Sequence, residues 1–205
     1  MLNFFELNMM IIFVSFLGFV LENIWLAATK GYIDNRNMNL PFLFGYGLVI
    51  IGFYTLIGTP ANLKITEWFG VYFSRRGGFI FYFFVSVILV SVGEMLLGTF
   101  VERIFGFEYW NYSRLPLHIT KYTSVPTSMG FGLIITLFMG YFFDNIMNQI
   151  HNMSDITVKV IGSVLMLLIT ADFIYSFAVM YRKRSLNIKW EKRCRLVSGL
   201  KKLLY

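Results

Sequence analysis

Four acidic side chains lie where this 205-residue sequence is most apolar. Glu22, Glu94 and Asp172 fall inside long apolar runs, and Glu102 lies near the end of one. A charged side chain at the centre of a bilayer costs at least about 2.5–3.5 kcal/mol, so such residues usually face the protein interior and serve a function. The alternative is a protonated carboxyl group that only joins two helices through a hydrogen bond. We therefore take these four residues as candidates for a polar path.

The spacing of Glu94 and Glu102 restricts the chemistry that the pair can perform. On one helix, a separation of eight residues corresponds to about 12 Å of rise and directions that differ by about 80°. Paired carboxylates that hydrolyse glycosides lie about 5–10 Å apart and flank the bond that is cleaved. The spacing instead favours one deep and one shallow carboxylate on a polar path, or two separate structural anchors.

Aromatic and polar residues follow the second of these glutamates. Trp and Tyr favour the headgroup level of a membrane, so this cluster is either an interfacial belt or the mouth of a polar path. An Asn-Arg pair in an earlier loop is a candidate counter-ion for a glutamate or a contact for a lipid headgroup. The candidate loop and mouth residues are Asn35, Arg36, Trp110, Asn111, Tyr112, Ser113 and His118.

The composition places these residues in an integral membrane protein. The chain is 57% hydrophobic and 14% charged, its mean hydropathy is +0.65, and soluble domains carry about 25% charged residues. Because lipid leaves no partner for backbone polar groups, runs of about 20 apolar residues are predicted to be helices. The predicted fold is an all-α membrane bundle over residues 1–184, with apolar segments at about 8–29, 41–60, 77–101, 124–147 and 157–181.

A basic tail at 185–205 follows the last apolar segment. Nine of the 18 Lys and Arg residues lie between Arg182 and Lys202. This location predicts a cytoplasmic C-terminus and contact with anionic lipid rather than nucleic acid. The tail is either an amphipathic helix in the membrane interface or a solvated segment. With five crossings, Lys64, Arg75 and Arg76 would face outward, against the rule that basic residues face the cytoplasm.

Few residues are available for other chemistry. Cys194 is the only cysteine, and the two histidines, His118 and His151, lie in different inter-helix segments. We therefore predict no metal site and no cofactor. No nucleophile–base pair is apparent, which favours a protein that is not an enzyme. No phosphate-binding G-x-x-x-x-G-K-[ST] motif is present, so any ATP hydrolysis would need a separate subunit.

The pattern of residues resembles the CmpB-type ABC-transporter family of bacterial multi-pass membrane proteins. The strongest section contains Glu94, Glu102, Phe105, Trp110-Asn111-Tyr112-Ser113, Leu115-Pro116 and Ser128-Met129-Gly130, and the weaker first section contains Glu22, Trp25, Asn35-Arg36 and Pro41 to Gly47. Several positions depart from the family pattern, and the Gly-Arg pair that follows the family Asn is lost, with Lys121-Tyr122 nearby instead. Asn111 stands where the family has Asp, Asn37 where it has Gly and His118 where it has Asn.

The resemblance implies a permease-like or accessory subunit that transports a small or lipid-like molecule. It also implies a bacterial cell membrane location. Because five helices are few for a complete permease, a homodimer or a separate ATPase subunit is the expected assembly. Two alternatives stay open. One is a membrane-embedded enzyme that modifies lipids, and the other is a structural protein whose basic tail binds a soluble partner.

Overall fold

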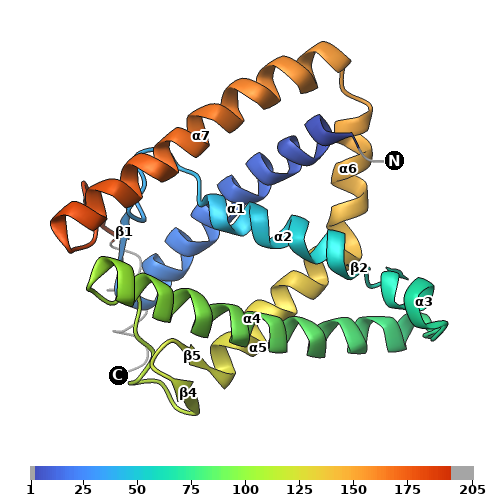
Figure 1. The fold of residues 1–205 in the computed structure, drawn as a ribbon, viewed down its shortest axis with the longest axis horizontal. Coiled ribbons are helices and arrows are strands. Elements are labelled where there is room, and N and C mark those ends of the chain that lie inside the picture. The colour runs from blue at the N-terminus through green and yellow to red at the C-terminus, as the bar shows by residue number, and fades with distance from the viewer. Residues whose placement is uncertain (1–2, 195–205) are drawn as a thin grey trace. The chain divides into compact units, whose positions relative to one another are not determined.

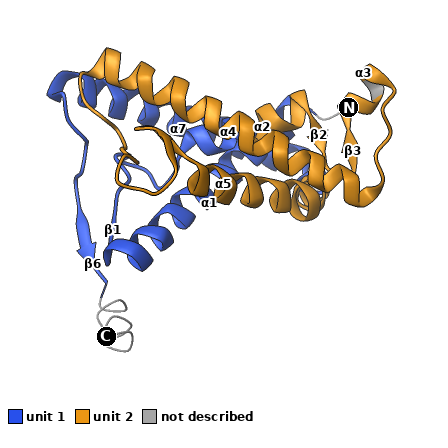
Figure 2. Ribbon diagram, turned by 90° about the horizontal axis from the view of Figure 1, so that it is seen from below, with its two compact units in different colours: residues 1–49, 150–205 blue, residues 50–149 orange. Residues whose placement is uncertain are grey.

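The computed structural model describes residues 3–194, apart from the side chain of Glu67. The chain is almost entirely helical and divides into two compact units, coloured separately in Figure 2. Unit 1 combines residues 1–49 with 150–205, and unit 2 comprises residues 50–149. The all-α prediction is confirmed.

Four helical stretches of the described chain are long and apolar enough to cross a membrane: Phe4–Lys30, Arg75–Phe105, Val125–His151 and Asp155–Lys183. The predicted segment at 41–60 contains only a shorter apolar helix, α2 (Phe44–Leu56). It is followed by a small hairpin of β2 (Gly58–Thr59) and β3 (Asn62–Leu63) and by the short α3 (Lys64–Phe69).

Unit 1 is built on α1 (Phe4–Lys30) and α7 (Asp155–Lys183), which run in the same direction (Figure 1). Gly162 of α7 lies against Met9 of α1, where an added Cβ would be 3.3 Å from the Met9 sulfur. Asn3 caps the start of α1 together with Glu6, and Gly31 ends it at φ 79°. Glycine is suited to this left-handed position because it has no Cβ.

The segment that follows α7 returns to the loop after α1. Its strand β6 (Glu191–Arg193) pairs antiparallel with β1 (Tyr32–Asp34), and Asn187 is buried. Residues 185–194 are therefore extended chain docked on unit 1, which differs from the interfacial helix considered for the tail. The rest of that predicted segment, 195–205, lies outside the described residues.

Unit 2 is built on an antiparallel pair, α4 (Arg75–Phe105) and α5 (Val125–Leu137). Two glycines let the helices approach closely, because an added Cβ would lie 2.6 Å from Val87 at Gly132 and 2.4 Å from Phe79 at Gly140. Gly140 lies in a π-helical turn, η1 (Phe138–Phe142), which continues into α6 (Phe143–His151). Between α4 and α5 lies a hairpin of β4 (His118–Thr120) and β5 (Thr123–Ser124).

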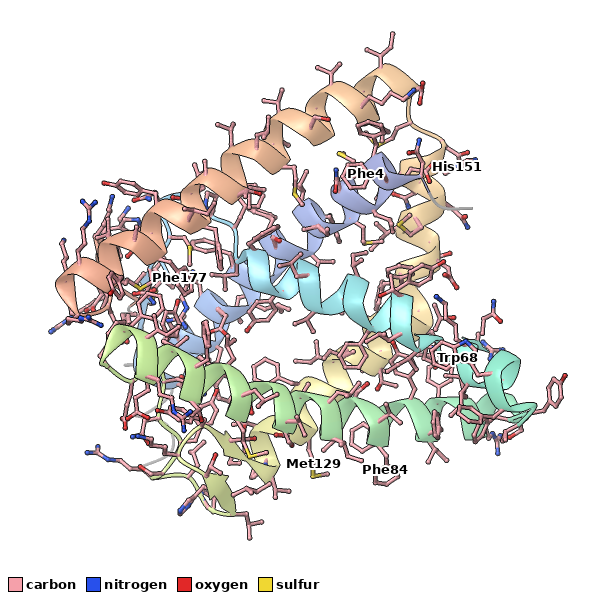
Figure 3. All side chains as sticks on the ribbon, viewed as in Figure 1. Phe4, Trp68, Phe84, Met129, His151 and Phe177 are labelled. Carbon is pink, nitrogen blue, oxygen red and sulfur yellow. The ribbon has the colours of Figure 1, made fainter. Side chains whose placement is uncertain are left out.

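Large apolar side chains cover the outer faces of the long helices. Phe84 of α4 is 59% exposed and Met129 of α5 is 48% exposed, and both point away from their ribbons in Figure 3. Helices with such surfaces are typical of membrane proteins, because lipid is as apolar as these side chains. The polar residues gather instead at loops and between helices.

Candidate functional site

Glu22 is held on two sides within unit 1. Tyr46 donates a hydrogen bond to Glu22 Oε1, and Arg36 Nη2 donates to Oε2 over 2.9 Å. The Tyr46 ring lies directly on Gly18, where an added Cβ would be 2.6 Å from Tyr46 Cγ. Arg36 Nη1 also lies 3.7 Å from Asp34 Oδ1. The predicted counter-ion for a glutamate is thus in contact with Glu22.

Asn35 joins the loop after α1 to the C-terminal segment. Its amide nitrogen donates to Met38 O (2.8 Å) and Asn187 O (2.9 Å), and its oxygen accepts from Lys189 N (2.9 Å). Asn187 Nδ2 donates in return to Asn37 O over 3.1 Å. Because Asn35 is only 2% exposed, its position fixes the loop rather than offering a contact to a ligand.

Asp172 caps the same loop from α7. Its carboxylate accepts from Leu40 N over 2.8 Å and from Asn39 N over 3.1 Å, and it also accepts from the Asn39 side chain. Ser176, one turn later on α7, is fully buried beside it. Asp172 therefore has a clear structural partner in the backbone of this loop.

Glu102 in unit 2 is held in the same way as Glu22. Tyr122 donates to Oε2 over 2.5 Å and Lys121 Nζ to Oε1 over 2.6 Å. The Tyr122 ring lies on Gly98, where an added Cβ would be 2.3 Å from Tyr122 Cγ. Lys121 also donates to Glu108 over 2.9 Å, so one cation serves two carboxylates.

These contacts shift the pKa values of the loop residues. The hydrogen bond to Glu102, followed by that to Glu108, raises the pKa of Lys121. The hydrogen bond from Lys121, followed by that from Asn111, lowers the pKa of Glu108. Burial, followed by the bond to Glu102, raises the pKa of Tyr122. The loop therefore keeps both charges of its ion pair over a wide range of pH.

The aromatic cluster after α4 binds the same hairpin. Trp110 Nε1 donates to Tyr122 O over 2.9 Å, and Tyr112 N donates to Lys121 O over 2.7 Å. Ser113 N donates to Asn111 Oδ1 over 2.8 Å. A surface cleft of about 330 Å³ is lined by Asn111, Ser113 and Arg114. Exposed His118 makes a contact of 3.2 Å from Nδ1 to Leu115 O.

Glu94 has a different environment from the other three acidic residues. Thr123 donates to Glu94 Oε2 over 2.8 Å, and the Thr123 hydroxyl lies 2.9 Å from that of Ser128. Thr123 of β5 and Ser128 of α5 are both fully buried. Within residues 3–194, no Lys, Arg or His forms an ion pair with Glu94.

The predicted residues thus form two groups, one in each unit. Asn35, Arg36, Glu22 and Asp172 surround the first loop, and the others surround the second. Sequence reasoning missed the tyrosine partners Tyr46 and Tyr122, and the role of Lys121. A signal for the tyrosines was present, because a glycine stands one helical turn before each paired glutamate (Gly18 and Gly98). No three metal-binding side chains come together in the described part of the chain.

The model of the family described as "Putative ABC-transporter type IV" matches residues 9–177. No curated protein and no solved structure matches the chain. The match confirms the CmpB-type resemblance. With the long apolar helices, it indicates a membrane protein related to transport. The chain belongs to the "Putative ABC-transporter type IV" family.

Proposed function

We propose that the chain is a permease-like or accessory membrane subunit in the transport of a small or lipid-like molecule, and that Glu94 is the polar group that serves this transport. Glu22, Glu102 and Asp172 then hold loops in place. The observation that carries the proposal is that Glu94 lies inside an apolar helix with hydroxyl partners and, among residues 3–194, without an ion-pair partner.

The immediate surroundings of Glu94 support this role. A carboxyl group within a membrane helix is costly, and selection keeps such groups mainly where they act on a substrate, an ion or a proton. The start of α5 offsets part of the cost, because the partial positive charge of a helix N-terminus favours an acidic group nearby. Thr123 and Ser128 also supply hydroxyl groups that donate or accept as the charge on Glu94 changes.

A line of small and hydroxyl residues extends from this position along the α4–α5 seam. On the α5 side these residues recur every four positions, and so lie on one face: Ser124, Ser128, Gly132, Thr136 and Gly140. On α4, Ser86 is fully buried and its hydroxyl has no hydrogen-bond partner among the described residues. Buried hydroxyl groups without partners are uncommon, which makes this seam the favoured course of a polar path.

The proposed partners are an ATPase subunit, a second copy of the chain and anionic lipid. Transport driven by ATP needs a phosphate-binding loop, and no such motif is present in this sequence. The basic residues after α7 favour the cytoplasmic side of a bacterial cell membrane, where anionic headgroups attract Lys and Arg.

Purification from native membrane, with mass spectrometry of the proteins and lipids that accompany the chain, tests the class of function. A co-purifying ATPase supports the proposal. A lipid that is chemically altered only when Glu94 is intact would instead assign an enzyme. A soluble protein without ATPase motifs that is lost on deletion of 185–205 would assign a structural role.

Glu94→Gln tests the residue itself in a strain that depends on the chain. We expect lost growth or transport with an unchanged melting temperature and unchanged partners. Asp155→Asn is the matched control, because Asp155 is an exposed carboxylate with a 72% exposed side chain at the start of α7. Full activity of Glu94→Gln would contradict the proposal for Glu94 while leaving the transport class open.

A further inference from the structure

The two paired glutamates belong to clusters that have the same set of contacts. We define clamp 1 as Gly18, Glu22, Arg36 and Tyr46, and clamp 2 as Gly98, Glu102, Lys121 and Tyr122. In each clamp the tyrosine ring lies on the glycine, the tyrosine hydroxyl donates to the glutamate, and a loop cation binds the other carboxylate oxygen. Each cation also contacts a second acidic residue of its loop.

The sequences around the two glutamates support the same correspondence. Leu17-Gly18-Phe19-Val20-Leu21-Glu22-Asn23-Ile24-Trp25 aligns without a gap on Leu97-Gly98-Thr99-Phe100-Val101-Glu102-Arg103-Ile104-Phe105. Leucine, glycine, glutamate and isoleucine recur in register, and an aromatic residue follows in both. Glycine and glutamate one turn apart lie on the same helix face, so one tyrosine can contact both.

The elements around the clamps also correspond. Each clamp joins a long helix to the segment that follows it: Tyr46 lies in α2, and Lys121 and Tyr122 lie in the turn between β4 and β5, just before α5. In each hairpin a glycine of the second helix packs against the first. Gly47 of α2 approaches Ile11 O, and Gly132 of α5 approaches Val87. Each long helix ends at a glycine with positive φ, Gly31 and Gly106.

We propose that residues 7–47 and 87–132 are two copies of one helical hairpin, and that Gly18, Arg36 and Tyr46, like Gly98, Lys121 and Tyr122, are positioning residues. They orient a glutamate and fix the loop that follows the long helix. Glu94 is the main difference, because Val14 stands at its place in the first copy. The duplicated part therefore holds loops, and the second copy carries the additional carboxyl group.

Limited trypsin digestion of the full-length protein in detergent tests the proposal, because each clamp contains its own cleavage site. We expect Arg36 and Lys121 to resist cleavage while they bind their glutamates. We expect Gly18→Ala to raise cleavage after Arg36 by about tenfold and to leave cleavage after Lys121 unchanged, since its Cβ displaces the Tyr46 ring. Gly98→Ala gives the reverse pattern. Gly45→Ala and Gly93→Ala are controls, because an added Cβ meets no atom within 4 Å at either position.

Two further sets of variants distinguish the loss of one clamp from unfolding of the whole protein and test whether the two cations are equivalent. If a glycine variant opens the whole protein, Tyr46→Phe and Tyr122→Phe remove only the hydroxyl group and must each expose their own site. The exchange pair Arg36→Lys and Lys121→Arg tests equivalence, and protection within about twofold of the wild type is expected at both sites. Loss of protection in the exchange pair, or equal opening of both sites in each tyrosine variant, would overturn the proposal.

Discussion

The loops after α1 and α4 are held to their helices by the same kind of clamp, yet they obtain their remaining hydrogen bonds from different parts of the chain. In unit 1 the loop binds Asn187, Lys189 and strand β6, which lie more than 150 residues later. In unit 2 the loop closes on itself through β4 and β5, and Trp110 binds a carbonyl group only 12 residues away.

This difference shows that a clamp attaches the loop to its helix, whereas other segments supply the remaining hydrogen bonds of the loop. The local hairpin of unit 2 needs short-range contacts, whose loop entropy is small. The loop of unit 1 depends on a segment that must return from the end of α7. The two units therefore respond differently to changes outside their clamps.

The membrane crossing of α2 is the prediction with the largest expected effect, because the readout is all or none. Strands β1 and β6 pair, so the loop after α1 and the segment after α7 lie on one side of the membrane. If the three later long helical stretches each cross, α2 and its flanks must supply a fourth crossing between these points. In a Cys194→Ser background, Ala61→Cys is expected to react with an impermeant maleimide only from the side opposite to Ser185→Cys.

Asn152→Cys controls the crossing test, since it precedes α7 and belongs on the same side as residue 61. Labelling of residues 61 and 185 from the same side would contradict the crossing of α2.

Packing in unit 2 gives the largest expected change in stability. Gly132→Leu places side-chain atoms where even a Cβ would lie 2.6 Å from Val87. Overpacking of this kind costs about 3 kcal/mol, measured as the free energy of unfolding in a detergent titration. Gly130→Leu is the control, because an added Cβ there meets nothing within 4 Å. A similar loss in both variants would show that the close approach is not the cause.

Asn35→Ala tests how strongly the loop of unit 1 depends on the segment that follows α7. The change removes three hydrogen bonds at a buried position, and we expect a loss of about 2 kcal/mol. Trypsin should then cleave after Lys189 and Lys192 while Lys121 stays protected. Asn152→Ala, at an exposed asparagine of the same unit, should change neither the free energy of unfolding nor the cleavage pattern. Continued protection of Lys189 in Asn35→Ala would mean that strand pairing alone holds the segment.

The acid sensitivity of the second loop is the smallest expected effect. The pKa of Glu108 is lowered in the folded protein, so Glu108 stabilises the fold above its unfolded pKa of about 4.3. This stabilisation is lost as the pH falls through the lower pKa of the folded state. The pKa of Lys121 is raised in the folded protein, so its stabilisation of the fold is complete below the unfolded pKa of about 10.4. This stabilisation is lost as the pH rises through the higher pKa of the folded state.

A melting curve at each pH checks this prediction. Glu108→Gln should melt slightly below the wild type near pH 7 and at the same temperature in strong acid, where both side chains are neutral. A difference that persists in strong acid would assign the effect of Glu108→Gln to packing.

The long helices were predictable because their signal is local. The run at 77–101 predicts α4, and Ser74 and Gly106 extend the helix beyond that apolar run at both ends through capping. The separation of Glu94 and Glu102 along one helix was also predictable from helix geometry. They meet different residues, Thr123 for Glu94 and Lys121 for Glu102.

The partners of the loop residues were not predictable by the same reasoning. Nothing periodic links Glu102 to Lys121 or Asn35 to Asn187, because these pairs depend on how the chain turns between helices. The strand at 191–193 was missed for a related reason. Three charged residues carry no strand signal, and their pairing depends on the backbone of β1.

The distance along the chain between Asn35 and Asn187 has a consequence for the order of synthesis. These residues are 152 positions apart, and ribosomes add about 5–20 residues per second. The loop after α1 therefore waits roughly 8–30 seconds for its last partners, while the β4–β5 hairpin completes as soon as it emerges. During that interval the polar groups around Asn35 lack their final partners, so insertion factors or chaperones can bind them. Once residue 187 has been synthesised, Asn187 can occupy these groups.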